Sequence, residues 1–248
     1  MSAGPRQIRP PTAVGPLSCG PVSGHIPAMD ATCQQFEKRL RAAERRIITA
    51  LRTPARIQAL LDEIPYVGEE RYRSPLTFFR EQGGHCFDGA LFAAMALRRL
   101  GHRGVLVDLL PNHRDDDHLI AIYRRGGFLG AIAKSNYSGL RSREPVYRGV
   151  RELVMSYFEG HFNALGERTL RAYAYPLDLG RFDAGGWMWD DAGLESIGDA
   201  LNDRRTVTLV TPAMARRLTM VDERSKRAGL LGVRRDQLYQ PPAPGRSR

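Results

Sequence analysis

Cys86 is the residue of this sequence whose type and position best suit covalent chemistry. It follows two glycines and His85 and opens a run rich in alanine and leucine that stops at Gly101. Such a run predicts a buried helix over residues 86 to 100, with Cys86 in its first turn. A helix N-terminus favours a thiolate, and its free N–H groups can hold an oxyanion. Cys86 is therefore a candidate nucleophile, the alternative being a small apolar residue that packs the helix start.

His118 is the candidate base for this thiol. It opens an apolar run over residues 118 to 123, which predicts a strand. A cysteine at a helix start and a histidine on a facing strand form the layout of papain-like thiol enzymes. Taken alone, a histidine in a strand is more often a hydrogen-bonded structural residue, but together with Cys86 it is expected to act as the general base.

A third group should accept a hydrogen bond from the other imidazole nitrogen. If residues 124 to 127 form a hairpin turn, His118 falls opposite residues 133 to 136. A charged lysine cannot accept a hydrogen bond, serine accepts weakly, and an asparagine carbonyl is well suited. We therefore expect Asn136 to orient His118, with Ser135 as the second choice.

Further residues are candidates for binding the substrate or an oxyanion. Gln82 is one, because a side-chain amide just upstream of the cysteine serves as an oxyanion donor in papain-like enzymes, and Gly84 and His85 precede the nucleophile directly. Arg141 belongs to a polar, arginine-rich run over residues 135 to 148. This run could close over a cleft and bind a carboxylate, although such runs are more often solvated loops.

The sequence predicts neither a metal nor a cofactor. The run from His113 to His118 combines two histidines with three aspartates, but Arg114 lies inside it, so a solvated acidic turn is favoured over a metal site. His161 is expected to be a packed histidine. The cysteines show no CxxC spacing, which argues against structural zinc or a disulfide framework.

Helices and strands in an α+β arrangement are expected to position these residues. The apolar pattern predicts a hairpin in which Tyr123 faces Phe128. Proline after a capping threonine marks the start of two helices. The helices are expected over residues 33 to 52, 53 to 64, 86 to 100, 146 to 163, 194 to 201 and from 211 onward, and the strands over residues 105 to 110, 118 to 123, 128 to 133, 169 to 176 and 206 to 210.

Composition divides the chain into three parts. Residues 1 to 28 are rich in proline and glycine and are expected to be disordered, residues 33 to 212 to form one domain, and residues 213 to 248 to form a basic helix and tail. Much of the formal charge of +10 lies in that tail, which predicts at most weak polyanion contact. With no membrane-spanning or signal-like stretch, the cytosol is the expected location.

Residues 53 to 136 resemble the core of the transglutaminase-like superfamily, which has a papain-like fold. The resemblance rests on GGHCFDGALFAAMALRRLGHRGVLVDLL, on DDDHLIAIY and on GFLGAIAKSNY. It implies a helix that bears the nucleophile Cys86 on a small, mostly antiparallel sheet, with His118 as base and residues 134 to 136 as the orienting position. The aspartate common at that third position is missing, and the aromatic-rich signature after the histidine is reduced to Phe128.

The expected function is thiol-dependent acyl transfer on a peptide or amide-bearing substrate. A thioester at Cys86 would pass to water, which gives hydrolysis, or to an amine, which gives transglutaminase or acyltransferase chemistry. Because the usual aspartate is missing, the alternative is an inactive relative that serves as a binding module. A third hypothesis is a nucleic-acid-associated protein that uses the basic tail.

Overall fold

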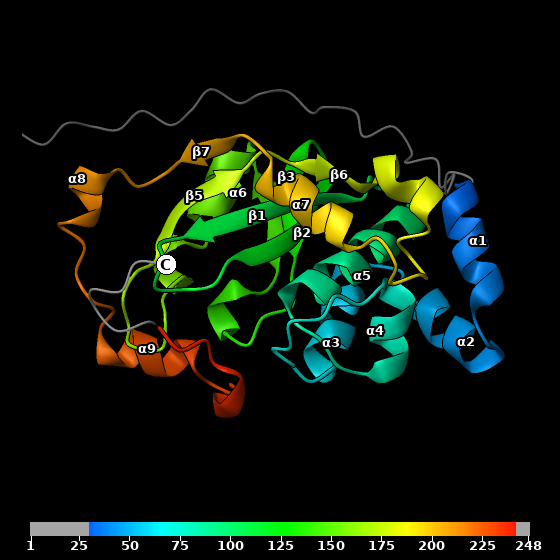
Figure 1. Cartoon of the computed structure of the whole chain (residues 1–248), viewed down its shortest axis with the longest axis horizontal. Helices are drawn as coiled ribbons and strands as arrows, with labels where there is room; N and C mark the ends of the chain where they lie inside the picture. The colour runs from blue at the N-terminus through cyan, green and yellow to red at the C-terminus, as the bar shows by residue number, and fades with distance from the viewer. Residues whose placement is uncertain (1–29, 242–248) are drawn as a thin grey trace, which may run out of the picture.

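An antiparallel sheet forms the centre of the structure, a computed structural model that describes residues 30–241 (Figure 1). Its strand order is β4-β3-β2-β1-β5-β7, with β6 paired to β1. This arrangement confirms the α+β class and the antiparallel sheet. The strands are β1 (Val105–Pro111), β2 (His118–Arg125), β3 (Phe128–Ile132), β4 (Arg143–Tyr147), β5 (Leu170–Ala174), β6 (Leu177–Asp178) and β7 (Thr206–Thr208).

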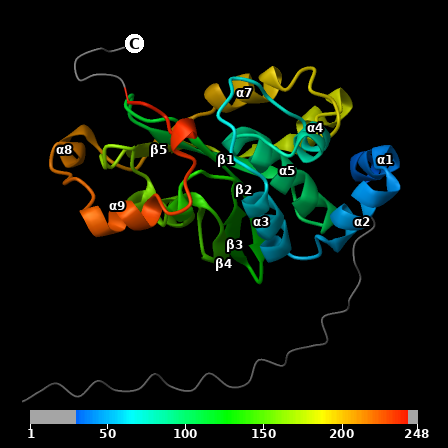
Figure 2. The same ribbon diagram turned by 90° about the horizontal axis from the view of Figure 1, so that it is seen from below.

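The helices lie at both ends of the sheet and against its faces (Figure 1). Figures 1 and 2 show α1 and α2 at one end and α8 and α9 at the other. The helices are α1 (Ala31–Arg39), α2 (Ala42–Ala50), α3 (Pro54–Glu63), α4 (Pro75–Glu81), α5 (Cys86–Arg99), α6 (Val150–Met155), α7 (Glu195–Asn202), α8 (Pro212–Ala215) and α9 (Glu223–Gly229). Short 3-10 helices lie at Ser138–Leu140, Phe158–Gly160, Leu179–Gly185 and Arg235–Gln237. Among the described residues, none of these helices has the length and apolar character needed to span a bilayer.

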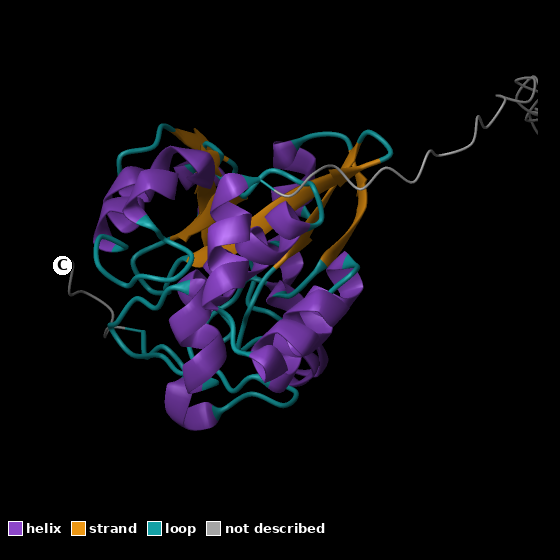
Figure 3. Ribbon diagram, turned by 90° about the vertical axis from the view of Figure 1, so that its right-hand side faces the viewer, coloured by secondary structure: helices purple, strands orange, loops and turns teal. Residues whose placement is uncertain are grey.

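Two apolar clusters cover the two faces of the sheet. Alternate side chains of β2, which are Leu119, Ala121 and Tyr123, pack into the cluster that holds α5. The intervening residues Ile120 and Ile122 pack into a second cluster with α6 and Tyr157. Figure 3, which shows the molecule from the right-hand side of Figure 1, has helices in front of the strands. Because successive side chains of β2 point to opposite faces of the sheet, only every second residue of the strand contacts α5.

Close contact holds α5 against the end of β3. A Cβ atom added at Gly89 would lie 2.2 Å from Lys134 Cβ, so glycine is required for this approach. Lys134 is buried, and its ammonium donates to Leu61 O at 3.0 Å and to Ile64 O, which caps the C-terminal end of α3. The start of α5 is thus fixed relative to the sheet by packing on both sides.

Several predicted elements need correction. The helix expected over residues 33 to 52 is two helices, because the backbone is extended at Leu40, which is buried in the core. The helix expected over residues 146 to 163 is shortened to α6 and a 3-10 turn. Helix α4 was not predicted, and β4 occupies part of the expected polar loop.

The hairpin that follows His118 is tighter than predicted. Its turn consists of Gly126 and Gly127, both with positive φ, as a two-residue turn requires. Arg125 consequently faces Phe128, and Tyr123 faces Gly130 instead of Phe128. The residue pairs of the ladder end at Ala121 and Ile132, before His118 is reached.

Candidate active site around Cys86

Cys86 occupies the first position of α5 and lines a cavity of about 850 Å³. The preceding His85 caps the helix: its Nδ1 accepts from the Phe87 N–H at 3.2 Å, and its Nε2 lies 3.1 Å from Arg71 O. A neutral imidazole with its proton on Nε2 satisfies both contacts. His85 therefore lines the cavity, and both of its ring nitrogens are already used for structure.

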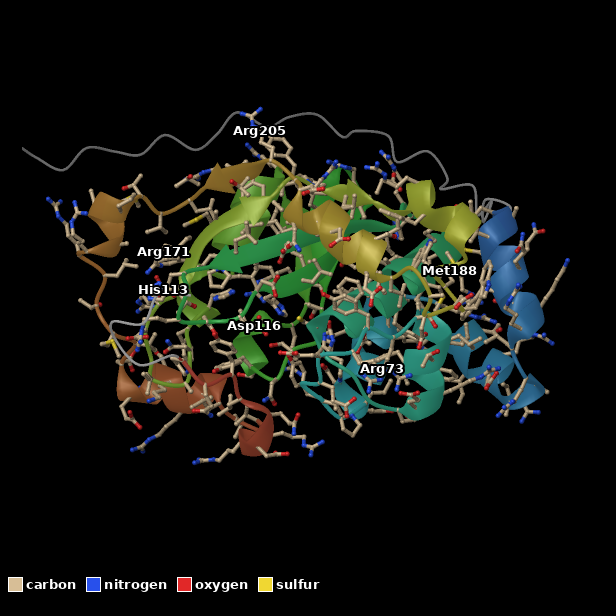
Figure 4. All side chains as sticks on the ribbon, viewed as in Figure 1. Arg73, His113, Asp116, Arg171, Met188 and Arg205 are labelled. Carbon is tan, nitrogen blue, oxygen red and sulfur yellow. The ribbon has the colours of Figure 1, made fainter. Side chains whose placement is uncertain are left out.

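A buried carboxylate holds the segment before Cys86 in place. Asp88 is fully buried and accepts hydrogen bonds from the backbone N–H groups of Arg73, at 2.8 Å, and of His85, at 3.2 Å. The Arg73 guanidinium adds a contact of 3.4 Å to Asp88 and pairs with Glu69 and Glu81 as well. Burial raises the pKa of Asp88, while the nearby positive groups oppose the rise. Figure 4 labels Arg73 on the α4 side of this network.

The environment of Cys86 keeps its thiol protonated. Burial raises the pKa of the thiol well above its usual value, and the negative charges of Asp117 and Asp116 raise it further. The Leu119 backbone N–H acts in the opposite direction but does not reverse the effect. The helix N-terminus was expected to favour the thiolate, whereas burial and the neighbouring carboxylates favour the thiol.

Tyr66 is a functional candidate that the sequence did not reveal. Burial raises the pKa of its hydroxyl well above its usual value, and the neighbouring Cys86 backbone N–H opposes that rise. The side chain borders the cavity next to the thiol. Its position depends on a bridge to Gly84 across the start of α5, which no local sequence pattern predicts.

The structure does not bring His118 to Cys86. The Cys86 thiol lies 3.9 Å from the backbone oxygen of Asp117, on the α5 side of β2. The His118 ring lies on the other face, where its Nε2 is 2.7 Å from Leu140 O and its centroid is 6.4 Å from that of Tyr157. Burial lowers the pKa of His118 to about 4. His118 is thus a neutral, packed histidine, because strand alternation turns it away from the thiol.

The residues expected to orient His118 have other partners. The Ser135 hydroxyl accepts from the Tyr137 N–H at 3.0 Å, and the Asn136 amide exchanges two hydrogen bonds of 2.9 Å with the backbone of Arg234. Leu140 O takes the position at the imidazole instead. Neither Asn136 nor Ser135 completes a triad in this structure.

Three further candidates also lie apart from the thiol cavity. Gln82 adopts a left-handed conformation (φ 53°) at the end of α4, and its amide donates to Phe79 O at 2.5 Å. Gly84 accepts a hydrogen bond from the Val67 N–H through its carbonyl oxygen. Arg141 pairs with Asp62 at 2.9 Å, on a partly exposed surface. Gln82 and Arg141 therefore serve local structure, and the donors they were expected to supply are not at Cys86.

Carboxyl groups dominate the cavity wall. Asp108 projects from β1, and Asp117 directly precedes β2; the two side chains interact in the cavity wall. Burial raises the pKa of Asp108 well above its usual value and that of Asp117, which is open to the cavity, to about 6. The acidic side chains of the lining are Glu69, Glu70, Asp108, Asp116, Asp117, Asp191 and Glu195. The acidic run is therefore not simply a solvated turn.

A smaller cavity of about 200 Å³ adjoins the first and contains His118 and His161. The two cavities share five lining residues, which are Tyr66, Gly68, Asp116, Asp117 and, from the C-terminal segment, Tyr239. His161 is packed, as expected, with its Nδ1 3.0 Å from the Thr169 hydroxyl. The described residues contain no group of three or more His, Cys, Asp or Glu side chains placed to hold a metal ion. Cys33 and Cys86 are both free thiols, and Cys19 and residues 1 to 28 lie outside the described part.

Comparisons with known proteins add no assignment. No family model matches the chain, and no curated protein matches it. Among solved structures, it is similar to LapG of Legionella pneumophila in an EGTA-treated form, with 13% identity, a TM-score of 0.31, and coverage of 42% of this chain and 68% of the other. The calcium-bound form gives 12% identity, a TM-score of 0.31, and coverage of 42% and 70%. Likeness at this level establishes neither a common fold nor a common activity.

Proposed function

We propose that the protein is a thiol-dependent acyl-transfer enzyme with Cys86 as nucleophile. The observation that carries the proposal is a thiol in the first turn of a buried helix, in the wall of a cavity large enough for a peptide side chain or a small amide. The resemblance of residues 53 to 136 to the transglutaminase-like core supports the same chemistry. Transfer of the acyl group to water gives peptidase or amidase activity, and transfer to an amine gives acyltransferase activity.

The proposal assigns the thiol proton to Asp117 instead of His118. Asp117 borders the same cavity as Cys86, and a carboxyl group with a pKa of about 6 is largely ionised at neutral pH. As the Sγ–carbon bond forms, the proton moves to the carboxylate and the carbonyl π electrons move to oxygen. When the intermediate collapses, the carbon–nitrogen or carbon–oxygen bond breaks and Asp117 returns the proton to the leaving group.

Tyr66 replaces Gln82 as the proposed oxyanion donor. Its hydroxyl already lies at the Cys86 backbone N–H, so a substrate oxygen placed there would meet both donors. The phenol remains protonated at neutral pH because burial raises its pKa. This arrangement needs no free backbone N–H beyond that of Cys86.

A binding module without acyl transfer is the second candidate. It is favoured by the raised pKa of the Cys86 thiol and by the packing of His118 on the other face of the sheet. Under this hypothesis the cavity binds a ligand, and Cys86 contributes only to its wall.

An acylation burst distinguishes the two candidates. With p-nitrophenyl acetate, the enzyme hypothesis predicts rapid release of one equivalent of p-nitrophenol and an acetyl adduct on Cys86, located by mass spectrometry. Cys86→Ala should lose the adduct, and Asp117→Asn should slow its formation about a hundredfold or more. His118→Gln should remain within a few-fold of the unmodified protein.

The same assay can contradict the enzyme hypothesis in several ways. An adduct that persists in Cys86→Ala belongs to another group, and a chain that forms no adduct at all supports the binding module. If His118→Gln rather than Asp117→Asn abolishes acylation, the imidazole is the base and the strand must rearrange during the reaction. Cys33, which is fully buried, serves as the internal reference thiol.

A further inference from the structure

One carboxyl oxygen in the cavity wall, within the described part of the chain, lacks a hydrogen-bond partner. Asp108 lies in the middle of β1, is only 3% exposed, and its Oδ1 has no hydrogen-bond partner within the described part of the chain. The carboxyl group otherwise interacts with the side chain of Asp117 and with the backbone N–H of Leu109. Burying a carboxyl group without a full set of partners is costly, so such an atom on a cavity wall indicates a ligand that supplies the missing donor.

The arginine side chains near this cavity wall already form ion pairs with acidic residues of the protein. Arg71, which borders the cavity, pairs with Glu81 at 3.0 Å and with Asp191 at 3.4 Å. Arg73 is committed to Asp88, Glu69 and Glu81. Although the whole chain carries a formal charge of +10, seven acidic side chains of the described residues line the cavity, and these two arginines pair with two of them, Asp191 and Glu69. Figure 4 shows Asp116, which also lines the cavity, near the middle of the molecule.

An aromatic surface borders the same cavity. The rings of Tyr72 and Phe87 stack with centroids 4.2 Å apart, and both residues line the cavity. Tyr72 is 38% exposed, so a ligand can reach its ring. A planar cation can lie on such a ring while its N–H groups reach carboxylates.

We infer that the cavity around Cys86 binds a guanidinium group through the carboxyl groups of Asp108 and Asp117. Two neighbouring carboxyl groups match the forked N–H donors of guanidinium better than the compact charge of an ammonium. The described residues do not form a metal-binding group, so an organic cation fits the cavity better than a metal ion. This inference rests on the proposed function in one respect, namely that the bound ligand is a substrate. Binding of the guanidinium group itself requires no chemistry at Cys86.

Calorimetry on the full chain carrying Cys86→Ala separates binding from acyl transfer. The probes are N-acetyl-arginine amide and its neutral isostere N-acetyl-citrulline amide. We expect the arginine amide to bind at least about tenfold more tightly, since hydrogen bonds to charged groups contribute more than neutral ones. Asp108→Asn and Asp117→Asn should each remove that preference, and Glu144→Gln, on an exposed strand outside the cavity, should preserve it.

Proton release provides an independent readout. Because the Asp117 pKa is raised to about 6 and Asp108 shares its proton, a bound cation should displace that proton. Titrations in two buffers of different ionisation enthalpy should show the release, and affinity should fall as the pH drops below about 6. If Asp108→Asn does not fold, Asp117→Asn still tests the inference, because the side chain of Asp117 is exposed.

Three results would overturn the inference. Equal binding of the citrulline amide would remove the cationic requirement, and equal binding of N-acetyl-lysine amide would remove the guanidinium assignment. Unchanged binding in both aspartate variants would place the ligand elsewhere. Every binding measurement uses Cys86→Ala, so the two experiments are independent. If the arginine amide does not bind, the acylation burst still tests the proposed function, and if no burst occurs, the binding result still stands.

Discussion

Asp117 and His118 are neighbours in sequence, yet they belong to different environments. Asp117 borders the α5 face, with Cys86 and Asp108 in a large acidic cavity. His118 lies on the α6 face, buried against Tyr157 and next to His161. Because side chains alternate along a strand, a shift of one residue decides which group meets the thiol. A histidine near a cysteine in sequence order is therefore weak evidence for a catalytic pair until the parity of the strand is known.

The two faces also respond to pH in opposite directions. On the α5 face, burial raises the pKa values of Asp108 and Asp117, so protonation favours the folded state. On the α6 face, burial lowers the pKa of His118 to about 4 and that of His161 to about 3, so deprotonation favours it. The thiol face and the imidazole face can therefore be separated by experiment.

The largest expected effect comes from removing the anchor of the thiol face. Asp88→Ala leaves Arg73 without its fully buried partner and two backbone N–H groups without an acceptor. We expect a loss of about 3–5 kcal/mol in the free energy of unfolding, measured by urea denaturation. Glu69→Gln is the control, because Glu69 is 58% exposed and its pair with Arg73 should contribute less than about 1 kcal/mol. A loss below about 1 kcal/mol in Asp88→Ala would show that the network does not hold the helix start.

The second effect isolates the imidazole face. The His118 pKa is about 4 in the folded state, and its ordinary value is 6.5. The contribution of the neutral ring to the free energy of unfolding is therefore complete above pH 6.5 and is lost as the pH falls toward 4. This loss corresponds to about 3 kcal/mol. His118→Gln should flatten the dependence of unfolding free energy on pH between 7 and 4, whereas Asp117→Asn should change it in the opposite sense. Equal pH profiles for His118→Gln and the unmodified protein would show that the ring is solvated.

The sequence predicted the main elements of the fold but not the faces of β2. The apolar runs at residues 86 to 100, 105 to 110 and 118 to 123 are each long enough to specify a helix or a strand. In β2, however, Leu119 and Ala121 are as apolar as Ile120 and Ile122, because both faces are covered. Periodicity distinguishes faces only where one of them is polar. Asp108, a single acid inside the run VLVDLL, was the available signal for the cavity face.

The candidate site was predicted in part, for a related reason. Cys86 and His85 do border a large cavity, since their position follows from the local helix start. The partners of Asn136, Arg141 and Tyr66 come from distant segments, and the Asn136 contact spans 98 residues of chain. Such contacts leave no local pattern. The side-chain chemistry made Asn136 a reasonable hydrogen-bond acceptor for His118, but chemistry alone could not show that the C-terminal segment occupies it.

The smallest effect tests that C-terminal segment. Asn136 holds Arg234 by two hydrogen bonds, and Gln237 accepts from the Gly68 N–H at 2.8 Å, so Tyr239 lies at the boundary of both cavities. Asn136→Ala should lower the unfolding free energy by about 1 kcal/mol and increase the rate of Cys86 acylation, because the segment covers the cavity less tightly.

Ser135→Ala is the matched control for that change. Ser135 precedes Asn136 directly and bonds only locally to Tyr137, so its removal should leave the acylation rate unchanged. The comparison also decides between two roles for Asn136. If Asn136→Ala slows acylation about a hundredfold while the unfolding free energy barely changes, Asn136 acts in the reaction, and its hydrogen bonds to Arg234 do not control the acylation rate. If acylation accelerates only in Asn136→Ala, the amide restrains the segment that borders the thiol.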